Sequence, residues 1–185
     1  MRPSTAVDIR AQARALSAAA YPGMVRSCFP YWDARIRPFL LLSVQSLPAE
    51  QFDFKPLPTM FTARQLIVHI AEAEHGWVSS VVEGGTYEDW LVPASAPAQG
   101  WALAVDAPDH AALIALLESA HTRTQFWLDQ PIAELDRAYT SQPPEGPALN
   151  LTLHWVLDRL QEHEIHHRSQ LNLYLRLMGV DPPGI

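Results

Sequence analysis

The segment LQEHEIHHRSQL, residues 160–171, carries three histidines within five positions of a predicted helix. His163 and His167 are four residues apart, so on a helix both rings lie on one face, with about 5 to 6 Å between their Cβ atoms. They continue an apolar stripe that begins at Leu153, so this face is predicted to point into the protein. Because an unpaired buried polar group costs on the order of 1 to 3 kcal/mol, a divalent metal that binds both rings would account for the pair. A hydrogen-bonded core role without metal is the alternative.

His69 is the predicted third ligand. It lies in the segment FTARQLIVHIAEAEHGWV, at the edge of a helical face formed by Leu66, Ile70 and Ala73. Three histidines at ~2.0 to 2.1 Å leave coordination positions open, whereas structural sites usually have four protein ligands. A divalent metal with an open coordination position lowers the pKa of a bound water or binds a thiolate.

Two carboxylates and one further histidine lie close to these ligands in the sequence. Glu72 and Glu164 are the candidate proton acceptors, and no catalytic residue is assigned. His166 is predicted at the rim of the site, because it is turned by 100° from His167 on a helix. The catalytic residues and the substrate therefore stay open at this point.

The string HEIHH also matches H-E-x-x-H, in which the glutamate is the general base of a metalloprotease. No histidine follows it between Arg168 and Ile185, and no sheet is predicted that could bind a peptide substrate. A protease is therefore disfavoured.

Composition excludes several other classes of protein. The net charge of −7 and the pI near 5.5 argue against binding to nucleic acid or to an anionic membrane surface. No apolar run approaches the roughly 18 to 20 residues of a membrane helix. The single cysteine, Cys28, permits no internal disulfide and fits a cytoplasmic location.

The N-terminal residues 1–23 are predicted to be a polar, Ala-rich extension ahead of one domain, residues 24–185. Asp8, Arg10 and Arg14 stand where an export signal needs apolar residues. Met24 is an alternative start of translation.

Sixteen prolines divide the chain into four predicted helices, within residues 31–46, 62–83, 106–130 and 151–178. Pro38 should kink the first helix or mark its effective start, and Thr62 with Gln65 has the spacing of a capping box. No alternating Val/Ile/Thr-rich run requires a strand. The prediction is an all-α four-helix bundle. The loop of residues 86–107, at ~3.3 Å per residue, can cross a helix of ~30 Å, which gives an up-down-down-up order, with up-down-up-down as the alternative.

The His69 segment together with the ending HEIHHRSQLNLYLRLMGVDPP resembles the DinB-like (DinB/YfiT-like) family of metal-dependent hydrolases. The resemblance covers residues 31–183. It implies an up-down-down-up four-helix bundle, commonly a homodimer, with a three-ligand metal site at His69, His163 and His167. Zinc and nickel are the metals it implies.

Family resemblance leaves the reaction open. Some members resemble enzymes that use a low-molecular-weight thiol, mycothiol or bacillithiol, as maleylpyruvate isomerases and thiol S-transferases do. The predicted function is therefore a metal-dependent enzyme that activates a thiol (S-transferase type) or water (hydrolase type) on a small-molecule substrate. A non-catalytic bundle with a structural or ligand-sensing metal site is the alternative.

Two positions depart from the family pattern. Ser169 replaces a glycine that often follows the arginine of the last motif. Asp158 and Arg159 stand where many members carry an aromatic residue or a histidine, so substrate contacts are not carried over.

Overall fold

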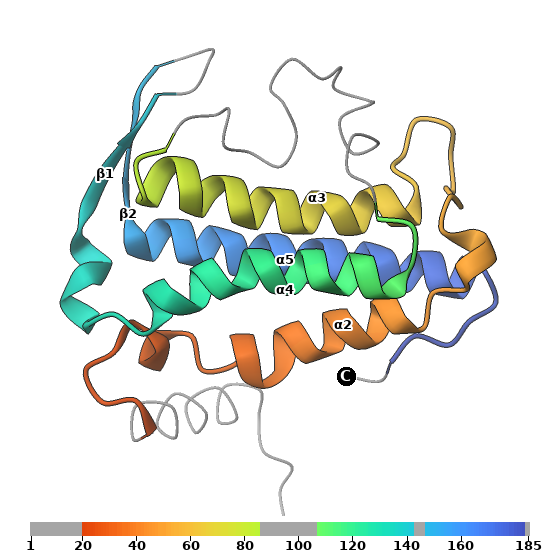
Figure 1. The fold of residues 1–185 in the computed structure, drawn as a ribbon, viewed down its shortest axis with the longest axis horizontal. Helices are drawn as coiled ribbons and strands as arrows, with labels where there is room; N and C mark the ends of the chain where they lie inside the picture. The colour runs from red at the N-terminus through yellow and green to blue at the C-terminus, as the bar shows by residue number, and fades with distance from the viewer. Residues whose placement is uncertain (1–19, 86–106, 143–146, 184–185) are drawn as a thin grey trace, which may run out of the picture.

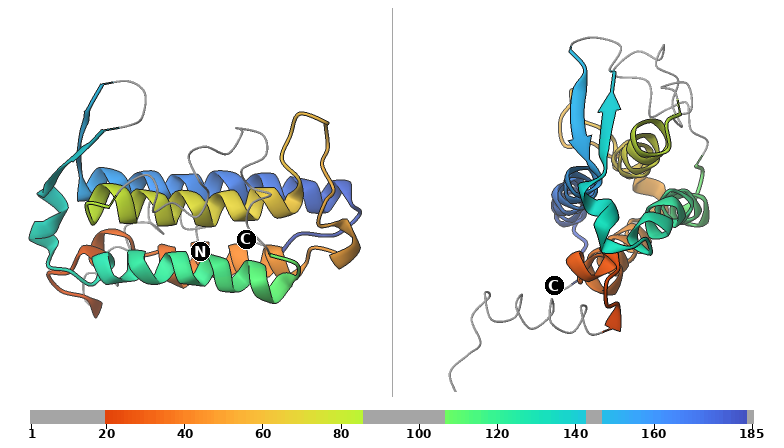
Figure 2. Two further views of the ribbon diagram at one scale, coloured as in Figure 1. Left: turned by 45° about the horizontal axis from the view of Figure 1, so that its top comes forward. Right: turned by 90° about the vertical axis from the view of Figure 1, so that its left-hand side faces the viewer.

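Four α-helices dominate the computed structural model, which describes residues 20–85, 107–142 and 147–183. They are α2 (Arg37–Gln45), α3 (Ala63–Gly76), α4 (His110–Leu128) and α5 (Leu153–Leu177). The helices lie side by side, and the end-on view of Figure 2 places them around a common centre. The colours in Figure 1 show that α2 and α5 run in one direction and that α3 and α4 run in the opposite direction. Most of the predicted extension and of the predicted 86–107 loop lies outside the described residues.

The helices begin where the sequence places polar caps. Thr62 and Gln65 form the predicted capping box at the start of α3. The Asp109 side chain accepts a hydrogen bond from the backbone of Ala112, and Thr152 caps α5 in the same way. These caps satisfy backbone N–H groups that a helix leaves unpaired at its first turn.

Two wider π-helical turns adjoin α2 and α3. The first, Trp32–Ile36, precedes α2, so the predicted helix over residues 31–46 becomes α-helical only at Arg37. Pro38 lies in the first turn of α2, where its missing N–H costs least, and it marks the effective start of that helix as predicted. The second, Trp77–Val82, extends α3, and Gly84 then ends the segment with a positive φ of 77°. Shorter 3-10 helices span Val25–Cys28, Ala49–Gln51 and Ile132–Asp136.

The prediction that strands are not needed was wrong. Strands β1 (Ala138–Ser141) and β2 (Leu149–Thr152) pair antiparallel, with Ala138 opposite Thr152. The predicted fourth helix therefore begins at Leu153 rather than near Leu151. Strands of four residues, mostly exposed, need no apolar alternation, because backbone hydrogen bonds pair them. The fold is mostly helical with one short ribbon.

Two apolar clusters fill the interior at opposite ends of the helices. One contains Leu40, Leu66, Leu117 and Leu171, and the other contains Trp32, Val78, Leu128 and Leu157, with their neighbours. On each helix, buried polar side chains lie between the two clusters. These residues, which we call the polar layer, are Arg37 on α2, Glu74 on α3, His121 and Thr124 on α4, and Glu164 and Arg168 on α5.

Arg37 lies at the centre of the polar layer. Its Nη2 donates to Glu74 and forms an ion pair with Oε2 of Glu164 at 2.9 Å. Trp32 donates from Nε1 to the same Glu164 oxygen at 2.9 Å. All four side chains are at most 5% exposed. The arginine therefore connects α2 to both α3 and α5 where water does not compete.

His121 extends the polar layer to α4. Its Nδ1 lies 2.7 Å from Oε1 of Glu74, and its Nε2 lies 2.6 Å from Oδ1 of Asp33. Burial raises the pKa of Glu74, but the charge of Arg37 and the hydrogen bond from His121 outweigh it, and this pKa falls to about 2. Burial raises the pKa of Glu164, and Arg37 offsets this only in part. The Glu74 carboxylate is therefore ionised at neutral pH.

Replacing Glu74 with glutamine should lower the free energy of unfolding at pH 7 by about 3 to 5 kcal/mol, because Arg37 loses its charged partner. The folded pKa of about 2 lies below the ordinary value of 4.5, so the contribution of Glu74 is complete above pH 4.5 and is lost as pH falls toward 2. Urea unfolding at pH 7 and at pH 3 should show the difference between wild type and E74Q shrinking at the lower pH. The exposed Glu50, changed to glutamine, is the control. An E74Q effect that is equal at both pH values would contradict this role.

Candidate metal centre

The three predicted ligands come together between two helices. His69 of α3 faces His163 and His167 of α5. The Nε2 atoms of His69 and His163 are 3.0 Å apart, and one nitrogen from each of the three rings lies within 4.8 Å of the others. The ring centroids of His69 are 4.7 Å from those of both other histidines. Two distant parts of the sequence thus place three donors at one point.

The polar layer explains why these rings point toward one another. Glu164 follows His163 directly and is turned inward to Arg37 and Trp32. With Glu164 fixed in the interior, the 100° turn between neighbouring helical residues places His163 and His167 on the side of α5 that faces His69.

The donor set fits a divalent metal. Two nitrogens bound to a tetrahedral metal at ~2.0 to 2.1 Å lie about 3.3 Å apart, close to the 3.0 Å between His69 and His163. Burial, followed by the charge of His167, lowers the pKa of His69 to about 4. Burial, followed by the neighbouring histidines and Arg159, lowers the pKa of His163 to about 3. Rings with such pKa values are neutral at pH 7, as metal ligands must be.

Gln170 orients the third ligand. Its Oε1 lies 2.8 Å from Nδ1 of His167, and its Nε2 lies 3.0 Å from Nε2 of His166. Since an amide oxygen can only accept, Nδ1 of His167 carries the proton and Nε2 is left with a lone pair for a metal. His166 is exposed and supports the site from its rim, as its position in the sequence predicted. By its i+3 and i+4 spacing from these histidines, Gln170 could either orient a ligand or simply pack against the helix, and the structure places its amide against both rings.

The structure removes Glu164 from the candidate proton acceptors. In a metalloprotease, the glutamate of H-E-x-x-H faces the metal and acts as the base. Here the Glu164 carboxylate is 2% exposed and pairs with Arg37 inside the bundle. The match to that motif is therefore coincidental, and Glu164 holds the helix in place.

A pocket of about 440 Å³ opens beside the three histidines. It is lined by His69, Glu72, Ala73, Trp77, Arg159, Leu160, His163, His166 and His167. Aromatic residues from the first predicted helix and from the 86–107 loop, lining a cavity beside the metal, would favour catalysis over a structural site. Among the described residues the aromatic wall is Trp77, and the loop lies outside them. The volume falls in the range of small-molecule sites.

Glu72 is the carboxylate of this pocket. It is 6% exposed, and burial raises its pKa to about 7. Its Oε2 lies 3.9 Å from Nδ1 of His69, which is too far for a hydrogen bond. A carboxylate with a pKa near neutrality can take up or release a proton at physiological pH.

The fold and the site together correspond to a known family. The family model described as "DinB family" matches residues 29–185, and the chain belongs to this family. Its three-histidine cluster is compatible with metal binding.

Two solved structures have a similar fold. A DinB-like protein from Bacillus cereus ATCC 10987 is 16% identical, with a TM-score of 0.62 over 88% of this chain and 98% of that one. The DinB-like protein YjoA from Bacillus subtilis is 23% identical, with a TM-score of 0.57 over 80% of this chain and 90% of that one. No curated protein matches the sequence. Among the described residues, none of the helices combines the length and apolar character that crossing a membrane requires.

Replacing Gln170 with alanine should weaken divalent metal binding about 10- to 100-fold, because His167 loses the partner that orients its ring. Isothermal titration of the chelator-treated protein with Zn²⁺ measures the effect. S169A is the control, since the Ser169 hydroxyl bonds to the backbone of its own helix at Ile165. Equal affinity in Q170A and wild type would contradict the orienting role.

Proposed function

We propose that this protein is a metal-dependent enzyme in which His69, His163 and His167 hold one divalent metal, zinc or nickel. The observation that carries the proposal is the convergence of three neutral imidazoles at the wall of an open pocket. When bound there, the metal supplies Lewis-acid chemistry and lowers the pKa of a thiol or a water. The substrate is a small molecule, because the pocket is of that size.

The pocket supports an enzyme over a purely structural metal site. A structural site normally closes with a fourth protein ligand. Among the described residues, the group of potential ligands around this point comprises the three histidines alone. The space next to them is enclosed by Trp77 and Leu160, so a ligand can approach the metal from the pocket.

Glu72 supports proton transfer in this pocket. The thiol or water that reacts must lose a proton, and the Glu72 carboxylate at the pocket wall accepts it. Desolvation makes this carboxylate a stronger base than an exposed glutamate, because its pKa is raised to about 7. Both thiol transfer, with a cosubstrate such as bacillithiol or mycothiol, and hydrolysis use this step. Thiol transfer is the reaction we favour.

The remaining assignments concern the whole molecule. The directions of α2 to α5 support an up-down-down-up four-helix bundle, which we assign to residues 24–185, with 1–23 as an extension.

Exposed apolar side chains on α5, at Ile165, Leu173 and Leu177, support a homodimer. The half-buried free Cys28 is consistent with a cytoplasmic location.

Elemental analysis of protein purified without a histidine tag should find about one divalent metal per chain. The H163A variant should lose it, because two ligands at this spacing bind far more weakly than three. H154A is the control, since His154 is on the same helix but exposed and outside the pocket. Metal-free wild type after growth with added zinc and nickel would contradict the site, as would equal metal content in H163A.

The E72Q variant should keep its metal and lose about 10²- to 10⁴-fold in kcat, since glutamine cannot accept a proton. The assays are thiol conjugation to electrophiles and hydrolysis of esters, with metal content measured on the same samples. Unchanged kcat in E72Q would remove Glu72 from the mechanism. Loss of metal in E72Q would mean that the carboxylate serves metal binding instead.

A further inference from the structure

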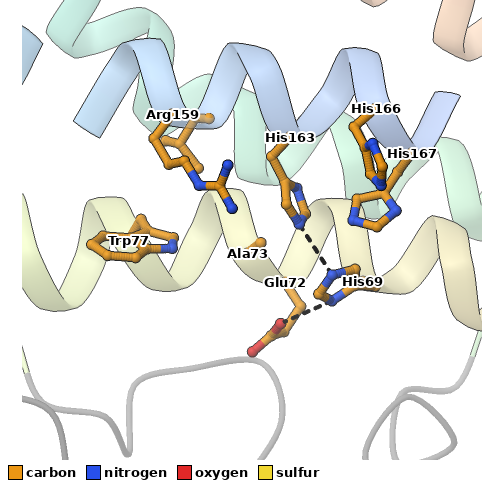
Figure 3. A pocket seen from close by; sticks show the side chains of 9 residues that line it. His69, Glu72, Ala73, Trp77, Arg159, His163, His166 and His167 are labelled. Carbon is orange, nitrogen blue, oxygen red and sulfur yellow. Dashed lines mark hydrogen bonds and ion pairs between the residues drawn. The ribbon is translucent and has the colours of Figure 1, made fainter. Parts of the chain in front are cut away.

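One end of the pocket carries a positive charge. Arg159 lies on α5 four residues before His163, so both side chains leave the same face of the helix, and both line the pocket. Figure 3 shows the guanidinium extending from α5 toward α3, on the side of His163 away from His167. The Cβ atoms of Arg159 and His163 are thus about one helical turn apart, roughly 5 to 6 Å.

Within the described part of the chain, the charge of Arg159 is only weakly neutralised. Its ion-pair partner among the described residues is Glu162, with Nη1 and Oε2 3.7 Å apart, which is beyond hydrogen-bond distance. The two side chains are 52% and 68% exposed, and such pairs contribute little. The planar guanidinium therefore retains donors that can bind a carboxylate through two parallel hydrogen bonds.

The surface between the two ends is apolar. Ala73 and Trp77, four residues apart on the facing helix, lie across from Arg159 and His163. Leu160 completes this part of the wall. Along its length the pocket thus presents a cation, an apolar section and the three-histidine centre, with Glu72 beside His69.

We propose that Arg159 binds the carboxylate of a small ligand whose other end reaches the three-histidine centre, and that it thereby determines the specificity of the pocket. The ligand class is a short-chain carboxylate with a metal-binding group at the opposite end, and Trp77 contacts its apolar middle. This inference rests on the proposed function, because the metal anchors the second end.

The binding of small thiols to the cobalt-substituted protein tests the role of Arg159 without an assay of enzymatic activity. Sulfur coordination to Co²⁺ gives a charge-transfer absorption band, so titration yields a Kd for each probe. The probes are 3-mercaptopropionate and 4-mercaptobutyrate, each paired with its neutral amide, at low ionic strength where charge is least screened. Of the two mercaptocarboxylates, the one whose chain length fits the pocket should bind to the wild type about tenfold more tightly than its own amide.

The R159Q variant should bind the acid and the amide equally, and R159K should retain part of the preference, since lysine keeps the charge but not the paired donors. R176Q, on the exposed last turn of α5, makes the same change of charge and should keep the wild-type ratio. Because each result is a ratio within one variant, a general change in cobalt affinity cancels.

The possible failures are distinguishable. If cobalt binds and thiols give the band, but the acid-to-amide ratio is the same in wild type and R159Q, the role of Arg159 is overturned and the metal site stands. If the wild type binds no stoichiometric cobalt, the proposed function fails, and this inference fails with it.

Discussion

The pairing of Arg37 with Glu74 and Glu164 is the interaction on which the rest of this structure depends. A buried guanidinium with two carboxylates is costly to desolvate, and it is tolerated only where the partners are held in place. The three residues come from three helices, and His121 brings in a fourth. A buried network of charges fixes the relative position of these helices more strictly than apolar contacts do, because any shift would leave a charge unpaired.

The three-histidine cluster depends on this constraint because its residues are sequence neighbours of the polar layer. Glu164 precedes Ile165 and follows His163, so fixing its carboxylate in the interior also fixes the side of α5 on which the histidines lie. Glu74 has the same relation to α3, two residues after Glu72 and five after His69. Both walls of the pocket are thus set by the polar layer. Pre-organised ligands avoid the cost of ordering flexible side chains at the moment a metal or substrate binds.

Burial serves the site in a second way. The surroundings that keep His69 and His163 neutral also raise the pKa of Glu72, because a poorly hydrated environment disfavours every charged form. One physical cause therefore keeps these imidazoles neutral and makes the neighbouring carboxylate a stronger base. The exposed Arg159 lies outside this environment and keeps its charge, so the pocket is electrically asymmetric.

The residue pattern alone determined where most of the helices lie and which histidines come together. The 3.6-residue period, the Thr62 cap, Pro38 and the proline-rich connections predicted the helices. The i, i+4 spacing of His163 and His167, taken with His69, predicted the three-histidine cluster. Both depend on local helix geometry. The β1–β2 ribbon could not be read from the sequence, since its pairing is held by the backbone rather than by a side-chain pattern. The sequence also did not show that Glu164 turns inward, that Gln170 bonds to His167, or that burial raises the pKa of Glu72. These depend on which groups from distant segments lie next to one another, and only the packing of the four helices decided that.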